Sequence, residues 1–378
     1  MISSFFSSLL FFTKLFFVKK HYDVIFYSPQ HFNRSKNHTN EYFSHLIDSC
    51  KKNNLSYIYF EEPSLKFQFK RCPHSIPFDF LYYLIIFLRK FMGSEMSYHY
   101  KDIKIGRFFK LLFFRRITFD NYITISQSML SFFNGLCIDA KKFDMQHGTI
   151  HSQKDSYLKD GIVSTNLIKN QVHLLLFGNG FQDLLISNDT QKYFISHSHV
   201  IGYFTNFYNQ NHVNVNRDVL VSLQFTDDHS LNENQNILDL LFDRISNETK
   251  FNFFLLNHPR FTTKIDLSSL LQLPNVFLSN NSLIDSLDKC SLHLTVYSTT
   301  TFEASIMGIP TSFLKINSLK MNIFDKQYNY PFYNSSLEDL YNNYITCSSK
   351  VKEWADNFYC IYSEKNFLKV LKNGSKKN

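Results

Sequence analysis

The chain has 378 residues, with 44% hydrophobic and 17% aromatic content, which provides ample apolar surface for packed cores and excludes an intrinsically disordered protein. This length suits two domains better than one, because single hydrophobic cores stop growing beyond about 250–300 residues. The formal net charge of +8 is moderate, and no zinc finger, RNP-like aromatic strand or extended basic stripe accompanies it, so nucleic-acid binding is disfavoured.

The six cysteines are widely separated and include no C-x-x-C pair. Their spacing fits neither a disulfide framework nor a zinc site, and the sequence contains no Asp-x-Asp motif that could hold a divalent ion. We therefore expect reduced thiols, a cytoplasmic protein, and no metal or other cofactor.

Residues 1–20 form an apolar segment rich in Phe, Leu and Ser that ends in Lys19 and Lys20. The apolar run is too short and too interrupted to span a bilayer, and it lacks the basic start and cleavage site of a signal peptide. An interfacial helix and an ordinary first helix both fit this segment, so both interpretations stay open.

Two later stretches also combine length with apolar character. Residues 78–92 form an unbroken run of Phe, Leu and Ile that favours a buried core helix over a membrane-facing one. Residues 107–116 interleave arginine and lysine with large apolar side chains, a pattern that suits an anionic lipid surface. We therefore expect peripheral contact with the inner face of the cell membrane.

The first domain is predicted over residues 21–205, where strand and helix patterns alternate. Such βαβ order predicts a mainly parallel sheet, which binds its ligands beyond the carboxyl ends of its strands. Gly178-Asn-Gly180 lacks the lysine of a phosphate loop and is interpreted as a tight turn. The predicted strands are 22–27, 55–60, 121–125, 141–145, 172–177 and 200–203, and the predicted helices are 42–52, 127–135 and 181–186.

The strand predicted at 141–145 runs directly into Gln146, His147 and Gly148. Glycine allows a close approach of substrate to the backbone, and an imidazole can act as base, acid or hydrogen-bond donor near neutral pH. His147 is therefore our candidate catalytic residue, and Gln146, Gly148 and His151 are candidate acceptor contacts. Two alternatives stay open: His151 as the functional histidine, or a histidine that only caps a turn.

A linker is predicted at 206–217, because periodicity is lost there and Asn, His and Gln dominate. The second domain is predicted over 218–335, followed by C-terminal helices and a basic tail over 336–378. Its predicted strands are 218–223, 251–256, 275–278 and 292–297, and its predicted helices are 234–246 and 283–289, with a further helix from about Phe302.

Two loops of the second domain carry groups that suit a nucleotide. His258 and Arg260 follow one strand, where the planar fork of arginine suits a phosphate. Ser298, Thr299 and Thr300 stand where a strand meets a helix, so a hydroxyl cap and unpaired backbone N–H groups would form an anion site. Glu303 follows within the first turn, where a carboxylate can accept hydrogen bonds from a ribose diol. The structural alternative is a capped helix whose Glu303 complements the helix dipole.

These motifs, together with Gly308-Ile-Pro310, resemble the two-Rossmann-lobe (GT-B type) glycosyltransferases, especially those that build bacterial surface polysaccharides such as LPS O-antigen or capsule. The resemblance implies an α/β fold of two Rossmann-like domains facing each other across a cleft. It also implies a nucleotide-sugar donor on the second lobe and a glycan or lipid-linked glycan acceptor on the first. Glu303 would then bind the ribose, His258 and Ser298 to Thr301 the phosphates, and His147 would be the base.

Three related families share part of this pattern. The His-Pro-Arg motif is similar to that of bacterial sialyltransferases, which use CMP-activated sugars, but Gln146 to Gly148 replaces their acidic triplet. Gln-His-Gly resembles the glycerophosphate polymerases of teichoic acid synthesis, although their acidic-Ser-Ser pattern is missing before Thr299. UDP-N-acetylglucosamine 2-epimerases share the architecture but have a glycine-rich turn before the glutamate. A membrane-associated assembly protein that has lost turnover is the non-catalytic alternative.

Overall fold

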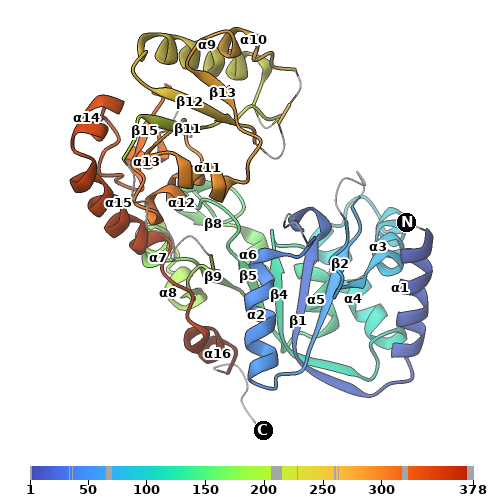
Figure 1. Cartoon of the computed structure of the whole chain (residues 1–378). Coiled ribbons are helices and arrows are strands. Elements are labelled where there is room, and N and C mark those ends of the chain that lie inside the picture. The colour runs from blue at the N-terminus through green and yellow to red at the C-terminus, as the bar shows by residue number, and fades with distance from the viewer. Residues whose placement is uncertain are drawn as a thin grey trace. The chain divides into compact units, whose positions relative to one another are not determined.

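The computed structural model describes residues 2–33, 35, 37–64, 70–205, 215–227, 229–258, 261, 262, 264–316 and 322–372. The chain forms two compact units (Figure 1). One comprises Met1–Phe177, Phe181–Phe204 and Tyr362–Asn378, and the other comprises Gly178–Gly180 and Thr205–Ile361. Most of the linker predicted at 206–217, Arg260, and the tail beyond Lys372 lie outside the described residues.

The first unit is built on a parallel sheet of seven strands in the order β10-β9-β5-β4-β1-β2-β3. Figure 1 shows α2 in front of this sheet and α4 and α5 behind it. A small antiparallel sheet, β6 to β8, follows β5 in the chain. The seven strands are β1 Lys20–Pro29, β2 Tyr57–Glu62, β3 Ile76–Pro77, β4 Ile117–Ile125, β5 Lys141–Met145, β9 Val172–Leu176 and β10 Ser198–Val200, and the three short ones are β6 Gln153–Lys154, β7 Leu158–Lys159 and β8 Ile162–Val163.

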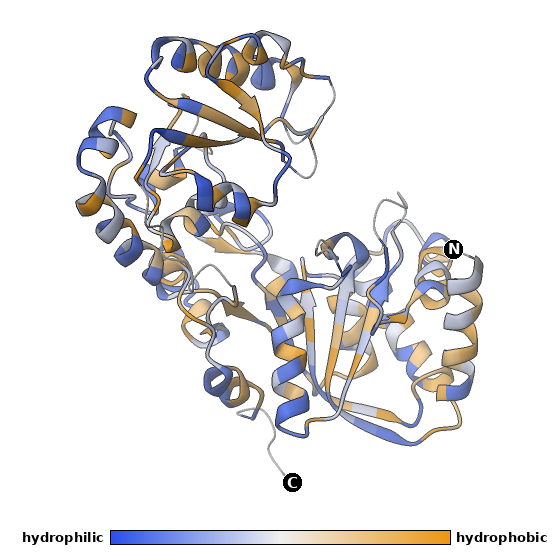
Figure 2. Cartoon of the chain, in the orientation of Figure 1, coloured by the Kyte–Doolittle hydropathy of each residue, from blue (hydrophilic) through white to orange (hydrophobic). Residues whose placement is uncertain are grey.

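Local sequence explains how these elements form. Helix α2 begins after Asn40, whose side chain accepts a hydrogen bond from the Tyr42 backbone N–H at 3.0 Å. Phe43, Leu46 and Cys50 recur at helical spacing and are fully buried, and hydrophobic and hydrophilic residues alternate along this helix in Figure 2. The helices of this unit are α1 Ile2–Leu15, α2 Glu41–Lys52, α3 Asp79–Phe91, α4 Tyr98–Leu112, α5 Leu130–Leu136, α6 Thr165–Asn170, α7 Asn179–Asn188, α8 Phe194–His197 and α16 Glu364–Lys372, with a 3-10 turn η1 at Gln30–Phe32.

The second unit has a parallel sheet of five strands in the order β13-β12-β11-β14-β15. Its core contains the inward-facing residues of β11, β12 and β14 together with one face of α9. The strands are β11 Asp218–Ser222, β12 Asn252–Leu256, β13 Val276–Leu278, β14 Leu292–Thr295 and β15 Thr311–Phe313. The helices are α9 Leu231–Asn247, α10 Ser268–Leu271, α11 Leu283–Lys289, α12 Thr300–Ile306, α13 Ile323–Lys326, α14 Leu337–Asn342 and α15 Tyr344–Phe358.

Two predictions need correction. The helix predicted at 127–135 begins only at Leu130, because Ser126, Gln127 and Met129 all take positive φ angles that no helix continues. The core-helix prediction for residues 78–92 is right for one face of α3 and wrong for the other. Leu81 is fully buried, whereas Phe91 is 72% exposed.

Gly178 and Gly180 have a packing role. A side-chain carbon on Gly178 would lie 2.4 Å from backbone atoms of Asn357 and Phe358, and one on Gly180 would lie 2.6 Å from the Phe358 ring. Both positions therefore accept only glycine while α15 packs against them. This contact accounts for the glycine pair without a phosphate.

Candidate active site

The sheet of the second unit changes direction between β11 and β14, since the chain proceeds from β11 to β12 on one side and reaches β14 on the other. Open parallel sheets bind ligands beyond the carboxyl ends of their strands at such a switch point. Hydrogen bonds connect the loop after β11 with the loop after β12 and with the loop after β14. The Thr262 N–H donates to the Phe225 carbonyl at 3.0 Å, and the Tyr297 N–H donates to Gln224 Oε1 at 2.8 Å.

The turn between β14 and α12 uses its first backbone N–H groups within the turn, which corrects the prediction of unpaired N–H groups at this point. Ser298 Oγ accepts a hydrogen bond from the Thr300 N–H at 3.2 Å and donates to Thr300 Oγ1 at 3.0 Å. The Ser298 carbonyl accepts from the Thr301 N–H at 3.1 Å, and the Thr299 carbonyl accepts from the Phe302 N–H at 2.9 Å. Thr299 occupies the N-cap position, and its side chain makes no capping hydrogen bond. Ser298, Thr299 and Thr300 are all half-buried at the carboxyl end of β14.

Glu303 lies one turn into α12 and is half-buried, but its Oε2 is completely enclosed. Among the residues that the structure describes, no group donates a hydrogen bond to this oxygen. Burial raises the pKa of the Glu303 carboxyl to about 8, so the ligand-free carboxyl is largely protonated near neutral pH. An enclosed carboxyl oxygen without a donor is costly in a folded protein, and a bound hydroxyl would remove that cost.

Aromatic packing around Phe302, the residue before Glu303, holds helix α12 in place. The buried Phe302 ring stacks on Trp354 at 5.0 Å and on Tyr359 at 4.6 Å between ring centroids. At its other end, Gly308 has a φ of 79°, and a side chain there would collide with Ser348. Both features fix the position of α12, and with it the turn that carries Glu303.

Sequence reasoning missed three residues at this switch point, namely Gln224, His229 and Tyr297. Gln224 bridges two strand ends, since its Oε1 also accepts from Thr295 Oγ1 at 3.2 Å. His229 is buried, and its Nε2 hydrogen-bonds with the Tyr297 hydroxyl. Gln224 and His229 lie after β11, and Tyr297 lies after β14. These positions were the available signal, because the rule that selected His258 after β12 also applies to the loops after β11 and β14.

His258 is half-buried in the loop after β12, and its carbonyl accepts from the Phe261 N–H at 2.8 Å. This loop is one strand farther from β14 than the loop after β11. Arg260, the predicted phosphate ligand, lies outside the described residues. The structure thus groups Ser298, Thr299, Thr300 and Glu303 on one turn and places His258 on a separate loop at the same edge of the sheet.

The first unit has its own switch point, between β1 and β4. His147 follows β5, the strand next to β4, and its ring meets the Phe32 ring edge-to-face at 5.3 Å between centroids. Phe32 belongs to η1, directly after β1. The His147 carbonyl accepts from the Tyr42 hydroxyl at 3.3 Å. His147 lies at the carboxyl edge of the sheet and is half-buried, with its Nδ1 enclosed.

Gln146 anchors the loop that carries His147. Its side-chain amide donates to the Gly148 carbonyl at 3.0 Å and accepts from the Phe177 N–H at 2.9 Å, and the side chain is almost fully buried. Both polar atoms of the amide are therefore used within the protein, which favours a positioning role over acceptor contact. Gly148 and His151 lie on the same loop and are half-buried.

A buried polar network supports this loop from below. Asp144, the fourth residue of β5, accepts from the Tyr157 hydroxyl at 3.0 Å and from the Gln127 N–H at 2.8 Å. Burial raises the pKa of Asp144 to about 7 and lowers the pKa of Lys154 to about 8. Lys154 donates to the Thr149 carbonyl at 2.7 Å, so β6 and β7 are tied to the segment after His147. Sequence reasoning did not identify this network.

The turn after β4 is strained. Ser126, Gln127 and Met129 have φ angles of 60°, 54° and 53°, which residues other than glycine seldom adopt. Such strain persists where surrounding contacts impose it and is common at functional sites. The turn lies at the carboxyl end of β4, beside the loop that carries His147.

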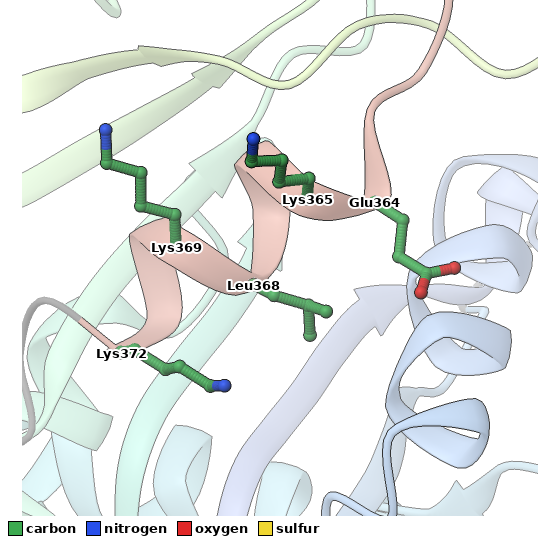
Figure 3. Close-up of a pocket in the computed structure, with 5 residues that line it drawn as sticks. All are labelled: Glu364, Lys365, Leu368, Lys369 and Lys372. Carbon is green, nitrogen blue, oxygen red and sulfur yellow. The ribbon is translucent and has the colours of Figure 1, made fainter.

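Two other features carry no predicted site residue. Within the described part of the chain, His21, Asp23 and Asp120 are the group whose geometry could hold a metal ion, but they lie at the opposite end of the strand β1. His21 Nε2 already pairs with Asp120 Oδ2 at 3.4 Å. A surface pocket lies along α16 (Figure 3), lined by Glu364, Lys365, Leu368, Lys369 and Lys372.

The sequence matches no protein-family model, and no curated protein matches it significantly. Solved structures do match the fold. The wall teichoic acid polymerase TagF is 12% identical, with a TM-score of 0.51 over 100% of this chain and 98% of that chain, and its H548A variant has a TM-score of 0.53 over the same shares. A UDP-GlcNAc 2-epimerase from Methanocaldococcus jannaschii is also 12% identical, with a TM-score of 0.50 over 94% of this chain and 99% of that chain.

The chain has a GT-B-type fold. At these identities the likeness concerns architecture alone, and it confirms the prediction of an α/β protein with two Rossmann-like domains. The fold alone does not identify a reaction, which depends on the residues at the two switch points.

Proposed function

We propose that the chain is a glycosyltransferase that moves a sugar from a nucleotide-sugar donor to a growing bacterial surface glycan. The observation that carries the proposal is the grouping of Gln224, Ser298 to Thr300 and the enclosed Glu303 carboxyl at the switch point of the second unit. The hydroxyl groups of this turn can donate to a phosphate, and an ionised Glu303 can accept from both hydroxyls of a ribose. Architecture shared with a wall teichoic acid polymerase supports a polymer-building role.

In this proposal His147 acts as the general base. Its imidazole takes the proton of the acceptor hydroxyl, whose oxygen attacks the anomeric carbon as the bond from that carbon to the donor phosphate breaks. The departing phosphate then keeps the electron pair and is stabilised by the donors at the second site. Residues 21–205 would thus form the acceptor domain and residues 218–335 the nucleotide-sugar domain. His258 and Arg260 are proposed as further phosphate ligands, and Gly148 and His151 as acceptor contacts.

We further propose that the glycan is an LPS O-antigen or capsule, that a CMP-activated sugar is a candidate donor, and that the protein works at the inner face of the cell membrane in contact with anionic lipid. The His-Pro-Arg motif supports the first two proposals, and the alternation of apolar and basic residues over 107–116 supports the third.

A second candidate is transfer of a glycerophosphate group. Both the fold shared with TagF and the Gln146-His147-Gly148 motif favour glycerophosphate transfer. A 2-epimerase activity is supported by the shared architecture alone. The non-catalytic assembly protein is the remaining alternative, and it predicts neither nucleotide binding nor turnover.

The test is calorimetric titration of the purified chain with CMP, CDP, UDP, GDP and dTDP, comparing wild type with Glu303→Ala. Tight binding of one nucleotide that weakens in the variant would support the donor site and identify the donor class. Binding of none of them would refute the transferase and favour the assembly protein.

Product analysis separates the two transfer reactions once the nucleotide is known. Glycosyl transfer cleaves the bond between the anomeric carbon and oxygen, whereas glycerophosphate transfer cleaves a phosphorus–oxygen bond within the diphosphate. Mass spectrometry of the acceptor distinguishes an added sugar from an added glycerophosphate. A glycerophosphate product would overturn the first proposal and establish the second.

A further inference from the structure

The first unit has aromatic side chains exposed on three neighbouring helices. Helix α3 packs against both α1 and α4. Phe17, just after α1, is 73% exposed, Phe91 at the end of α3 is 72% exposed, and Leu111 on α4 is 68% exposed. Other large apolar residues with exposed side chains on or beside these helices are Phe6, Leu10, Val18, Phe87, Tyr98, Tyr100, Phe108 and Leu112. Soluble monomeric proteins seldom expose so many large apolar side chains on neighbouring helices unless that surface binds another molecule.

Each of these helices is anchored by its opposite face. Phe12 of α1 is fully buried and stacks on Phe60 at 5.6 Å between ring centroids. The Ser8 hydroxyl accepts from the Phe80 N–H at 3.2 Å, which ties α1 to α3. Arg89 of α3 forms a two-point ion pair with Asp102 of α4 at 2.7 and 2.8 Å. The exposed aromatic residues therefore stand on a fixed platform.

The charge of this surface indicates which kind of partner it binds. Helix α4 and the residues after it, 98–116, contain one acid, Asp102, which Arg89 already neutralises. The exposed basic residues of this stretch are Lys104, Arg107, Arg115 and Arg116. On α4 the exposed side chains alternate in kind, with Tyr100, Lys104 and Phe108 spaced four residues apart. The Lys104 ammonium lies 4.9 Å from the centre of the Tyr100 ring. A surface that is both aromatic and basic is complementary to the headgroup layer of an anionic bilayer.

These helices are too short to span a lipid bilayer. Helix α1 has 14 residues and α3 has 13. At about 1.5 Å per residue both are shorter than the roughly 30 Å hydrocarbon layer. Over the described ranges, no helix meets both the length and the apolarity that crossing a membrane requires. Figure 2 shows α1 largely in the colours of hydrophobic and weakly polar residues, which suits a helix at an interface.

We infer that the exposed face of α1, α3 and α4 is a docking surface for an anionic phospholipid bilayer, into whose headgroup layer Phe17, Phe91 and Leu111 insert while Lys104 and Arg107 meet lipid phosphates. This inference deepens the membrane contact proposed above and names the residues that make it. It does not depend on catalysis, because lipid binding is measured without donor or acceptor.

The experiment is flotation of the full-length protein with vesicles of phosphatidylcholine alone or with about 30% phosphatidylglycerol. The variants are Phe17→Ser/Phe91→Ser/Leu111→Ser and, separately, Lys104→Glu/Arg107→Glu. We expect wild type to bind the anionic vesicles at least about tenfold more tightly than either variant. Matched controls remove exposed apolar or basic residues elsewhere, namely Ile138→Ser/Ile345→Ser/Ile361→Ser and Lys289→Glu/Lys350→Glu, and should bind as wild type does.

Insertion has a direct readout. The chain contains a single tryptophan, Trp354, so Phe91→Trp adds a second at the proposed interface and Ile345→Trp adds one elsewhere. Fluorescence of Phe91→Trp should shift to the blue and be quenched by brominated lipid, and that of Ile345→Trp should not change. This measurement does not depend on whether the triple variant folds.

Two results would overturn the inference. The first is that the wild-type protein does not bind anionic vesicles, or that the charge-reversed variant binds them as tightly as the wild type and the control variants do. The second is that wild type dimerises without lipid while the Phe17/Phe91/Leu111 variant is monomeric, since a second copy of the chain would then be the occupant. Nucleotide binding in calorimetry is unaffected in either case, so the donor-site proposal stands or fails separately.

Discussion

Glu303 provides the sharpest test of the nucleotide site, because its pKa connects binding to pH. The enclosed carboxyl has a pKa near 8 through burial, whereas a ribose diol is bound by the ionised form. The ionised fraction of such a group rises from about one tenth at pH 7 to about nine tenths at pH 9. The affinity for a ribonucleotide should therefore increase about tenfold over that range, which corresponds to about 1.4 kcal/mol.

Calorimetric titration at several pH values measures this effect with the nucleotide that binds most tightly. Glu303→Gln keeps the shape of the side chain and cannot ionise, so its affinity should be lower at pH 9 and independent of pH above about 7, where the nucleotide phosphates are already fully charged. The corresponding 2′-deoxynucleotide lacks one hydroxyl, and wild type should bind it with a smaller pH response.

A pH-independent affinity in wild type would refute the reasoning, as would a tenfold increase that persists in Glu303→Gln. The first result would mean that Glu303 does not contact the ribose. The second would assign the pH response to another group at the switch point.

Three further predictions follow from the first unit. His147→Ala should reduce transfer at least about 100-fold while nucleotide affinity stays within about twofold, and an equal loss of both would contradict its role as base. Tyr157→Phe leaves Asp144 Oδ2 without its donor, while the Gln127 N–H still donates to Oδ1, and should lower the free energy of unfolding by about 1–3 kcal/mol in urea denaturation, unlike the same change at an exposed tyrosine. Burial lowers the pKa of His173 to about 3 and that of His199 to about 4, below the unfolded value of 6.5. Their stabilising contribution is therefore complete above pH 6.5 and lost as the pH falls toward 4, so urea denaturation at about pH 5 should show a loss of about 1–2 kcal/mol per histidine. His173→Phe should reduce that loss, and an unchanged acid response would exclude the pair as its source.

The main strands of both units were predictable because parallel strands buried on both faces appear as continuous apolar runs. Residues 141–145 were predicted as a strand and form β5 with the same limits. The short strands β3, β6, β7 and β8 were not predicted, because two residues carry no periodicity. Helix α4 was missed for a different reason. Its exposed side includes Tyr100, Phe108 and Leu111, so no polar stripe marks it as a helix.

The candidate site was predictable where local chemistry decides it. A row of hydroxyls between a strand and a helix predicted where α12 begins, and Ser298 accepts from the Thr300 N–H there, although the N-cap residue Thr299 makes no capping hydrogen bond. Gln224 and His229 follow a predicted strand and could have been selected by that position, but their contacts with Tyr297 depend on the pairing of β11 with β14, which no local pattern records. The buried partner of Asp144, Tyr157, is 13 residues away in sequence and was missed for the same reason.

Helix α16 has a consequence for the order in which the protein can fold during synthesis. It belongs to the first unit, where the Tyr362 hydroxyl hydrogen-bonds to Ser49 at 2.8 Å and Glu364 pairs with Lys52 at 3.1 Å. The second unit consists almost entirely of the continuous stretch from Thr205 to Ile361, so all of it leaves the ribosome earlier. The nascent chain can therefore complete its later unit first, while α2 keeps part of its surface uncovered until the last helix has been translated.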